Sequence, residues 1–186
     1  MWSSRTAWAG VAAMSSAMAA CDQLAATSEG KVWSIEKSAN KDAPRLTMKT
    51  ELSGVDTAGK VIPLELHLSG TGGSDWGSGG MRQLVEFKLI STSGAMLGEG
   101  PLLFVPEGKS RSPFGGGDVG SEVRQTPKGS VTCPTFIAHG AAASIRVLTG
   151  SEFIDTTAGD VKFRIDDERV RAMSELMRRI DATVPK

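Results

Sequence analysis

The chain has 186 residues, and its 21 Lys and Arg residues balance its 21 Asp and Glu residues, so its formal charge at pH 7 is zero. A neutral chain lacks the basic surface that recognises nucleic acid or an anionic membrane, so nucleic acid is not an expected partner. Tyr is absent, which counts against an aromatic surface that stacks on bases or sugars.

The N-terminus has the layout of a secretory leader. Arg5 precedes an acid-free, weakly apolar stretch that ends in Ala19-Ala20-Cys21. This ending resembles a bacterial lipobox, in which the cysteine is lipidated and becomes the new N-terminus. We therefore expect a signal peptide over residues 1–20 and a lipoprotein with an acylated, for example palmitoylated, Cys21. Residues 21–30 would form a tether that holds the protein on a membrane of the cell envelope, facing the periplasm or the exterior.

Two other interpretations of this segment stay open. Ala17-Met18-Ala19 also fits the A-x-A site of ordinary signal peptidase, which would leave Cys21 as a thiol able to pair with Cys133. The same residues could instead form a short structural helix of a cytoplasmic protein. A membrane span is not expected, because it needs about 20 strongly apolar residues.

Residues 31–186 have the size of one domain and a pattern of strands followed by one helix. Ile62, Leu64, Leu66 and Leu68 alternate with polar residues, which predicts a strand with one buried face. Similar patterns predict strands at Lys31–Lys37, Arg45–Leu52, Ile62–Leu68, Arg82–Ser91, Val131–Ala138, Ser144–Thr149 and Asp160–Ile165. Pro101–Pro106 is a short apolar run, and Glu107–Gly129 is expected to be a loose glycine-rich region.

The last segment, Asp167–Ala182, has the pattern of an amphipathic helix. Apolar residues recur every three or four positions, and Asp166 precedes them as a typical N-cap. A helix with so narrow an apolar stripe is expected to pack on a sheet. The expected fold is therefore mainly β: an antiparallel β-sandwich with one C-terminal amphipathic helix.

Candidate catalytic residues are few. Cys133 and His139 are six positions apart and could form a nucleophile and base, but no nucleophile elbow or orienting acid accompanies them. His67 and Glu65 lie on the polar face of one strand and point the same way, which suits either a metal site or an ordinary surface pair. The glycine runs lack the Gly-Lys-Ser/Thr of a phosphate loop, so no cofactor is expected.

A binding loop is the other candidate. Trp76, next to Asp75, lies at the centre of the glycine-rich segment Gly70–Gly80. An aromatic side chain in such a segment either anchors a partner or fills the core. The sequence therefore favours a non-enzymatic interaction or ligand-binding module with an envelope protein as partner. The alternative is a secreted or periplasmic hydrolase that uses Cys133 and His139, or a metal at His67.

Two stretches resemble a known family. Gly30–Ser38, Asp42 and Leu46–Thr50 are similar to the opening of the type VI secretion-associated periplasmic proteins of the VasI/TagO kind. Ile145-Arg146-Val147, the strand at Asp160–Ile165 and the helix that carries Leu176 are similar to their ending. The family's paired cysteines and its middle, corresponding to residues 70–130, have no match here. The resemblance implies an accessory role in the envelope without catalysis.

Overall fold

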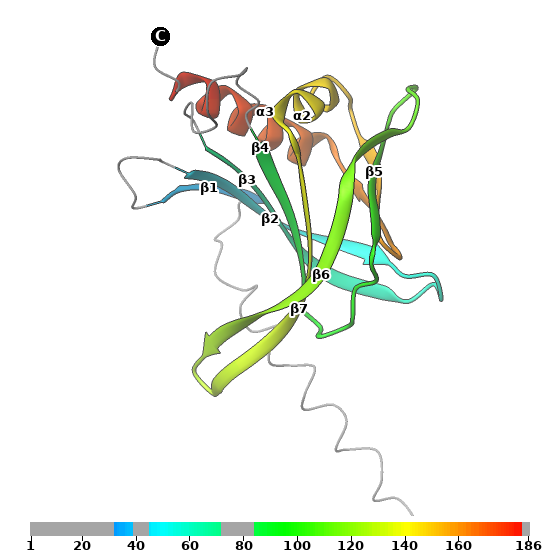
Figure 1. Ribbon diagram of the computed structural model, residues 1–186, viewed down its shortest axis with the longest axis vertical. Coiled ribbons are helices and arrows are strands. Elements are labelled where there is room, and N and C mark those ends of the chain that lie inside the picture. The colour runs from blue at the N-terminus through cyan, green and yellow to red at the C-terminus, as the bar shows by residue number, and fades with distance from the viewer. Residues whose placement is uncertain (1–31, 39–44, 72–83, 184–186) are drawn as a thin grey trace, which may run out of the picture.

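Antiparallel strands make up most of the molecule (Figure 1). The computed structural model describes residues 32–38, 45–71 and 84–183. Their strands are β1 (Trp33–Lys37), β2 (Arg45–Val55), β3 (Val61–Thr71), β4 (Leu84–Ser91), β5 (Gly100–Pro106), β6 (Ser112–Thr126), β7 (Gly129–Ala141), β8 (Ile154–Ala158) and β9 (Val161–Ile165). Their helices are α2 (Ala142–Leu148) and α3 (Asp167–Ala182).

The alternation of apolar residues in the first strands is confirmed. All four inward positions of β3, from Ile62 to Leu68, are buried, and so are Leu46, Met48 and Leu52 of β2. Each such side chain removed from water stabilises the fold by about 1.5–3 kcal/mol, which holds the alternate residues Glu65 and His67 on the outer face.

The sheet closes on itself, so the expected β-sandwich is wrong. The strand order is β1-β2-β3-β4-β7-β6-β5-β8-β9, and β9 also pairs with β2. The strands β2 to β9 therefore form an eight-stranded antiparallel barrel, and β1 is an additional strand on β2. Closure takes place at Gly54, which lies opposite Phe163. A Cβ atom at Gly54 would lie 2.5 Å from the Cγ1 atom of Val161, so only glycine lets the two strands approach.

Aromatic rings fill the barrel. Phe87 of β4 lies 5.8 Å from Phe104 of β5 and 6.3 Å from Phe163 of β9, measured between ring centroids. Phe114 of β6 lies 5.6 Å from Phe104. Edge-to-face and stacked pairs at these distances add to the stabilisation from burial, so the interior is a packed core.

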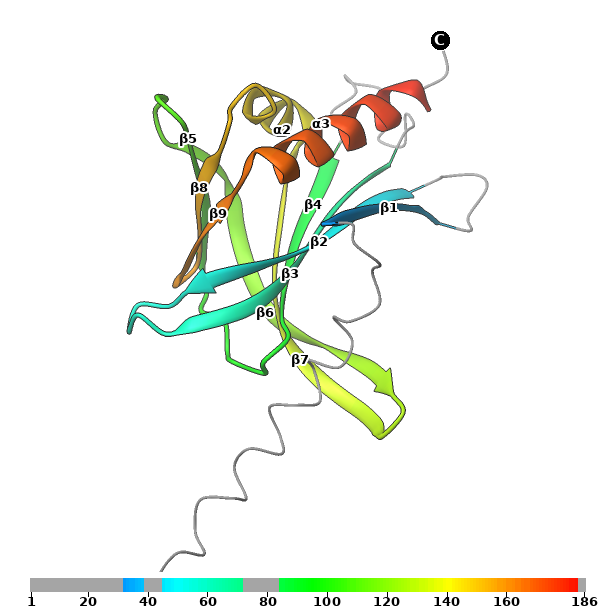
Figure 2. The same cartoon turned by 180° about the vertical axis from the view of Figure 1, so that it is seen from behind.

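Both helices cover one end of the barrel (Figures 1 and 2). The predicted C-terminal helix is confirmed as α3, and the carboxylate of its N-cap, Asp166, accepts a hydrogen bond from the backbone N–H of Arg169. Its buried residues are Val170, Ala172, Met173, Leu176, Met177 and Ile180. Ile180 occupies the space beside Gly70 of β3, so the helix seats directly on the sheet.

Two expectations for the second half of the chain are wrong. Residues 144–149 do not form a strand, because Ala142, Ile145 and Leu148 recur every three positions and bury one face of the helix α2. The region Glu107–Gly129 is not loose, because most of it belongs to the long strand β6, which pairs with β5 and β7. The strand β8 was not expected from the sequence.

Glycines within β6 are compatible with a strand because neighbouring rings cover them. A Cβ atom at Gly117 would overlap the ring of Phe136, and one at Gly140 of β7 would lie 2.7 Å from the ring of Phe114. The rings thus occupy the space that ordinary side chains would fill. Glycine at position 117 is a packing requirement rather than a sign of a loop.

Candidate functional site

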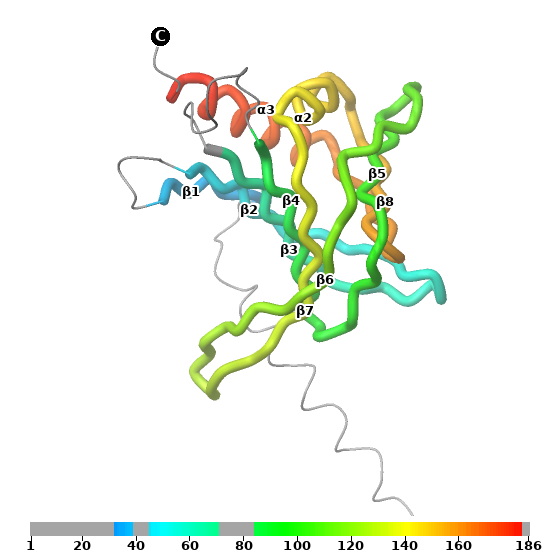
Figure 3. The backbone as a smooth tube through the Cα atoms, in the orientation of Figure 1, coloured from blue at the N-terminus to red at the C-terminus, as the bar shows by residue number. Residues whose placement is uncertain are grey.

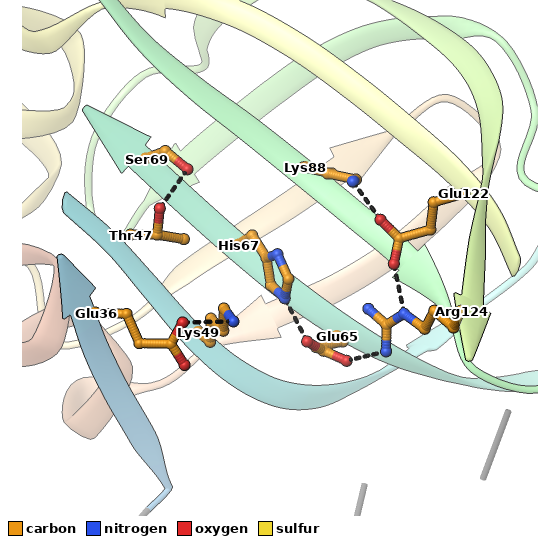
Figure 4. Close-up of polar contacts among 9 residues, drawn as sticks. All are labelled: Glu36, Thr47, Lys49, Glu65, His67, Ser69, Lys88, Glu122 and Arg124. Atoms are coloured by element: carbon orange, nitrogen blue, oxygen red, sulfur yellow. Dashed lines mark hydrogen bonds and ion pairs between the residues drawn. The ribbon is translucent and has the colours of Figure 1, made fainter. Parts of the chain in front are cut away.

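The outer face of β2, β3 and β4 carries a row of basic side chains. Lys49 lies opposite His67, and His67 lies opposite Lys88, so the three residues are direct cross-strand neighbours. Each of them bonds to a carboxylate: Lys49 to Glu36, His67 to Glu65 and Lys88 to Glu122 (Figure 4). The row is therefore neutralised by its own surroundings.

The end of the β6–β7 hairpin bends over this face. In the described part of the chain, residues Asp118–Thr126 of β6 pair only with β7, and residues Gly129–Pro134 of β7 pair only with β6. We call these two segments the β6–β7 ribbon. Ile90 of β4 and Cys133 of the ribbon are fully buried against each other, with Val131 packed beside them. This small second core holds the ribbon to the outside of the barrel.

Beside that small core, five polar side chains form a chain in which basic and acidic residues alternate (Figure 4). His67 bonds to Glu65, which accepts a hydrogen bond of 2.7 Å from Nη1 of Arg124. Arg124 also donates to Glu122, which in turn accepts from Lys88. The side chains are 15–24% exposed, so water screens them only in part. We call these five residues the ion network.

The ion network keeps its carboxylates ionised. Burial opposes ionisation of Glu65, but hydrogen bonds from His67 and Arg124 outweigh it and lower the pKa of Glu65 to about 2. The pKa of Glu122 is also lowered, because the bonds from Lys88 and Arg124 outweigh burial. An ionised carboxylate only accepts hydrogen bonds, so Nε2 of His67 carries the proton that it shares with Glu65.

A second histidine lies in a similar arrangement on the same face. Glu86 of β4 accepts from Arg45 of β2 at 2.6 Å, and Nε2 of His139 lies 3.4 Å from its other oxygen. Burial opposes ionisation of Glu86, but the contacts with Arg45 and His139 together outweigh it and lower the pKa of this carboxyl. Glu65 and Glu86 thus each contact one arginine and one histidine.

Chemically, these arrangements are suited to fastening strands together. Glu65 and Glu122 remain ionised throughout the physiological range, so neither can donate a proton as a general acid. Within residues 32–38, 45–71 and 84–183, no three His, Cys, Asp or Glu side chains gather closely enough to hold a metal ion. His67 therefore shares its site with only one other potential metal ligand, Glu65.

The structure does not bring the predicted nucleophile and base together. Cys133 and His139 both lie on β7, six residues apart, which corresponds to about 20 Å along an extended strand. Cys133 is fully buried, whereas His139 is exposed and faces Glu86. His139 lies within β7, one residue beyond the strand that the sequence predicts at Val131–Ala138.

Three other candidate residues lie outside the described residues. These are the lipidation site Cys21 and the loop residues Asp75 and Trp76. The segment with Trp76 connects β3 to β4, and the pairing of these two strands with each other ends at Gly70 and Val85. Gly70 contacts Ile180 of α3, so this connection begins at the end of the barrel that the helices cover.

The sequence pattern identified two of the five residues of the ion network, Glu65 and His67. The spacing of Glu65 and His67 on one strand predicted that they point the same way. Glu122 and Arg124 were overlooked because they follow the glycine run of β6. The signal that could have found them is the alternation of Glu122 and Arg124 with Ser121, Val123 and Gln125, which is a strand pattern with two opposite charges on one face.

No family model, curated protein or solved structure matches the chain. Neither helix in the described ranges has the length and apolar character needed to cross a membrane.

Proposed function

We propose that this protein is a non-enzymatic lipoprotein of the cell envelope that binds another protein through the β6–β7 ribbon. The observation that carries the proposal is the ribbon itself, which extends past the barrel at the end away from the helices (Figure 3). The second core and the ion network hold it on the barrel. Because the ribbon is already fixed in place, it loses little conformational freedom when a partner binds, and this favours affinity.

The ribbon also offers a suitable contact surface. Its side chains facing away from the barrel include Ser121, Val123 and Gln125, all of them exposed and uncharged. Val123 is 64% exposed, which makes it the largest apolar group on this surface. In contrast, the interior of the barrel is occupied by packed rings, which supports binding on the outside.

The proposed location in the cell envelope is inferred from the N-terminal leader. A lipid on Cys21 would hold the domain at a membrane, and a tether over residues 21–30 would connect it to β1. Several acyl chains on one cysteine hold a protein firmly, whereas one chain binds only marginally. Cys21→Ser should therefore move the protein from the membrane fraction to the soluble fraction. Intact-mass analysis that finds a mature chain starting at Cys21 without lipid would contradict this part of the proposal.

The binding surface is tested by photo-cross-linking in cells that make the full chain. A benzophenone amino acid replaces Val123 on the ribbon or, as the matched control, Val147 on α2, which is also 64% exposed. We expect a defined cross-linked product from position 123 and none from position 147. Equal products from the two positions, or none from position 123, would remove the ribbon as the binding surface.

The loop at Trp76 is the competing surface. A third variant with the same photo-reactive group at position 76 tests it in parallel. Position 76 belongs to the connection from β3 to β4 and position 123 belongs to β6, so products from the two positions identify different segments of the chain. A product from position 76 alone would transfer the binding function to the loop.

A further inference from the structure

One edge of the β6–β7 ribbon has no partner strand among the described residues. The strand β5 pairs with β6 only as far as Gly117, and from Asp118 to Thr126 the strand β6 pairs only with β7. The outer edge of this segment therefore presents backbone N–H and C=O groups. Such an edge is a template on which another extended strand can pair.

The sequence along this edge is complementary to itself. It reads Ser121-Glu122-Val123-Arg124-Gln125, with an acid and a base placed symmetrically about one apolar residue. If two copies pair antiparallel about Val123, Glu122 of each copy lies opposite Arg124 of the other. Ser121 then lies opposite Gln125, and the two Val123 side chains face each other.

In this register, the side chains on both faces of the strand have favourable partners in the other copy. On the face directed at the barrel, each Glu122–Arg124 pair between copies would continue the alternation of charge that the ion network already has. Opposite charges directly across an antiparallel pair are favourable, and like charges are not. On the other face, contact between the two Val123 side chains would remove their exposed apolar surface from water.

We propose that the β6 edge pairs antiparallel with the same edge of a second copy of this chain, with the twofold axis at Val123. This proposal depends on the proposed function, because it identifies the partner that the β6–β7 ribbon binds. The occupant is a second copy because twofold symmetry places each residue of the edge against its complement in the other copy. The two ribbons join into one continuous antiparallel sheet.

The register is tested by cysteine cross-linking of the full chain in an oxidising compartment. Cβ atoms directly opposite each other are about 4.5–5.5 Å apart, close to the spacing of a disulfide. Val123→Cys should therefore form a reducible dimer at about tenfold the level of Val147→Cys, which has the same exposure on α2. The wild-type chain, which carries Cys21 and Cys133, sets the background.

A second pair of variants tests the same register at another position. Chains with Ser121→Cys should cross-link to co-expressed chains with Gln125→Cys, and each should cross-link poorly to itself. Self-cross-linking of Ser121→Cys that exceeds that of Val123→Cys would overturn the axis at Val123.

A charge at the axis tests the association itself. Val123→Lys places two like charges against each other and should weaken the dimer at least about tenfold, measured by sedimentation equilibrium of the detergent-solubilised full chain. Val147→Lys is the control and should leave association unchanged. A wild-type chain that is monomeric at all concentrations would overturn the proposal.

The cross-linking results also separate this inference from the proposed function. A product from position 123 that contains only a different protein would reject the second copy but retain the ribbon as a binding surface. The absence of any product from position 123 would reject both.

Discussion

Arg124 of β6 donates a hydrogen bond of 2.7 Å from Nη1 to Oε2 of Glu65 on β3, although 59 residues separate them in the sequence. The strands β4 and β7 lie between β3 and β6 in the sheet, so this contact spans the outer face of the barrel. It joins the β6–β7 ribbon to a strand with which the ribbon does not pair. The first two predictions concern this contact.

Removal of the guanidinium should loosen the ribbon. Arg124→Gln leaves Glu65 and Glu122 without their shared partner in a partly buried position, which should lower the free energy of unfolding by about 1–3 kcal/mol. Arg171→Gln is the control, because Arg171 forms only an exposed pair with Asp167 within α3 and should cost less than about 0.5 kcal/mol. Urea titrations of the two variants measure the difference, and equal losses would show that the ion network contributes no more than a surface pair.

Glu65 should make stability depend on pH in acid. Folding lowers the pKa of Glu65 from 4.5 to about 2, so the folded state binds fewer protons than the unfolded state between these values. Its contribution is therefore complete above about pH 4.5 and is lost as the pH falls towards 2, with a magnitude on the order of 2–3 kcal/mol. Urea titrations should show that Glu65→Gln costs stability at pH 7 and that the cost shrinks below pH 4.

The matched control for this pH effect is Glu152→Gln, which changes an exposed carboxylate outside the ion network. Its effect on the free energy of unfolding should be small and similar at pH 7 and pH 3. A cost of Glu65→Gln that persists unchanged at pH 3 would mean that ionisation of Glu65 does not stabilise the fold.

Two adjacent glycines of β6 should respond differently to substitution by alanine. Gly117→Ala places a methyl group within the ring of Phe136, and the resulting displacement should cost about 1–3 kcal/mol. Gly116→Ala has nothing within 4 Å of the new Cβ atom and should be neutral or slightly stabilising. Thermal unfolding of both variants provides the comparison, and a double variant with Phe136→Leu should cost less than the sum of its single changes.

The packing of α3 on the barrel is tested by truncating one buried side chain. Leu176 is fully buried, so Leu176→Ala should cost about 2–5 kcal/mol. Ser174 lies on the exposed face of the same helix, and Ser174→Ala should change stability by less than about 0.5 kcal/mol. Similar values for both variants in urea titrations would indicate that the helix does not stabilise the barrel.

The elements that were predicted correctly are those in which local pattern and burial agree. Alternation from Ile62 to Leu68 and the stripe of α3 each follow from one buried face per element. The strand that contains Gly117 was not predicted, because glycine has low strand propensity. Glycine is suitable at this position because the ring of Phe136, on a neighbouring strand, occupies the space of a side chain. The strand expected at Ser144–Thr149 is wrong, because Ala142, Ile145 and Leu148 recur at helical spacing and bury one face of α2, although Ile145 and Val147 are β-branched.

Neither the closure of the barrel nor the ion network could be predicted from local sequence patterns. Whether strands form two sheets or one closed sheet depends on the pairing of β2 with β9, which are more than 100 residues apart in the chain. Glu65 and His67 are two residues apart, so their common orientation followed from strand geometry. Their contact with Arg124 depends on the bend of the ribbon over the outer face, which no spacing in the sequence expresses.

The position of β1 outside the closed ring has a mechanical consequence. Since β2 pairs with β1 over residues 46–50 and with β9 at residues 54–55, the ring does not depend on β1. Tension on the chain before Trp33 would first act on the hydrogen bonds between β1 and β2. Release of Trp33–Lys37 would lengthen the connection by roughly 17 Å, at about 3.3–3.6 Å per residue, while the eight-stranded ring stays closed. The strand β1 would thus extend under tension before any force acts on the hydrogen bonds of the barrel.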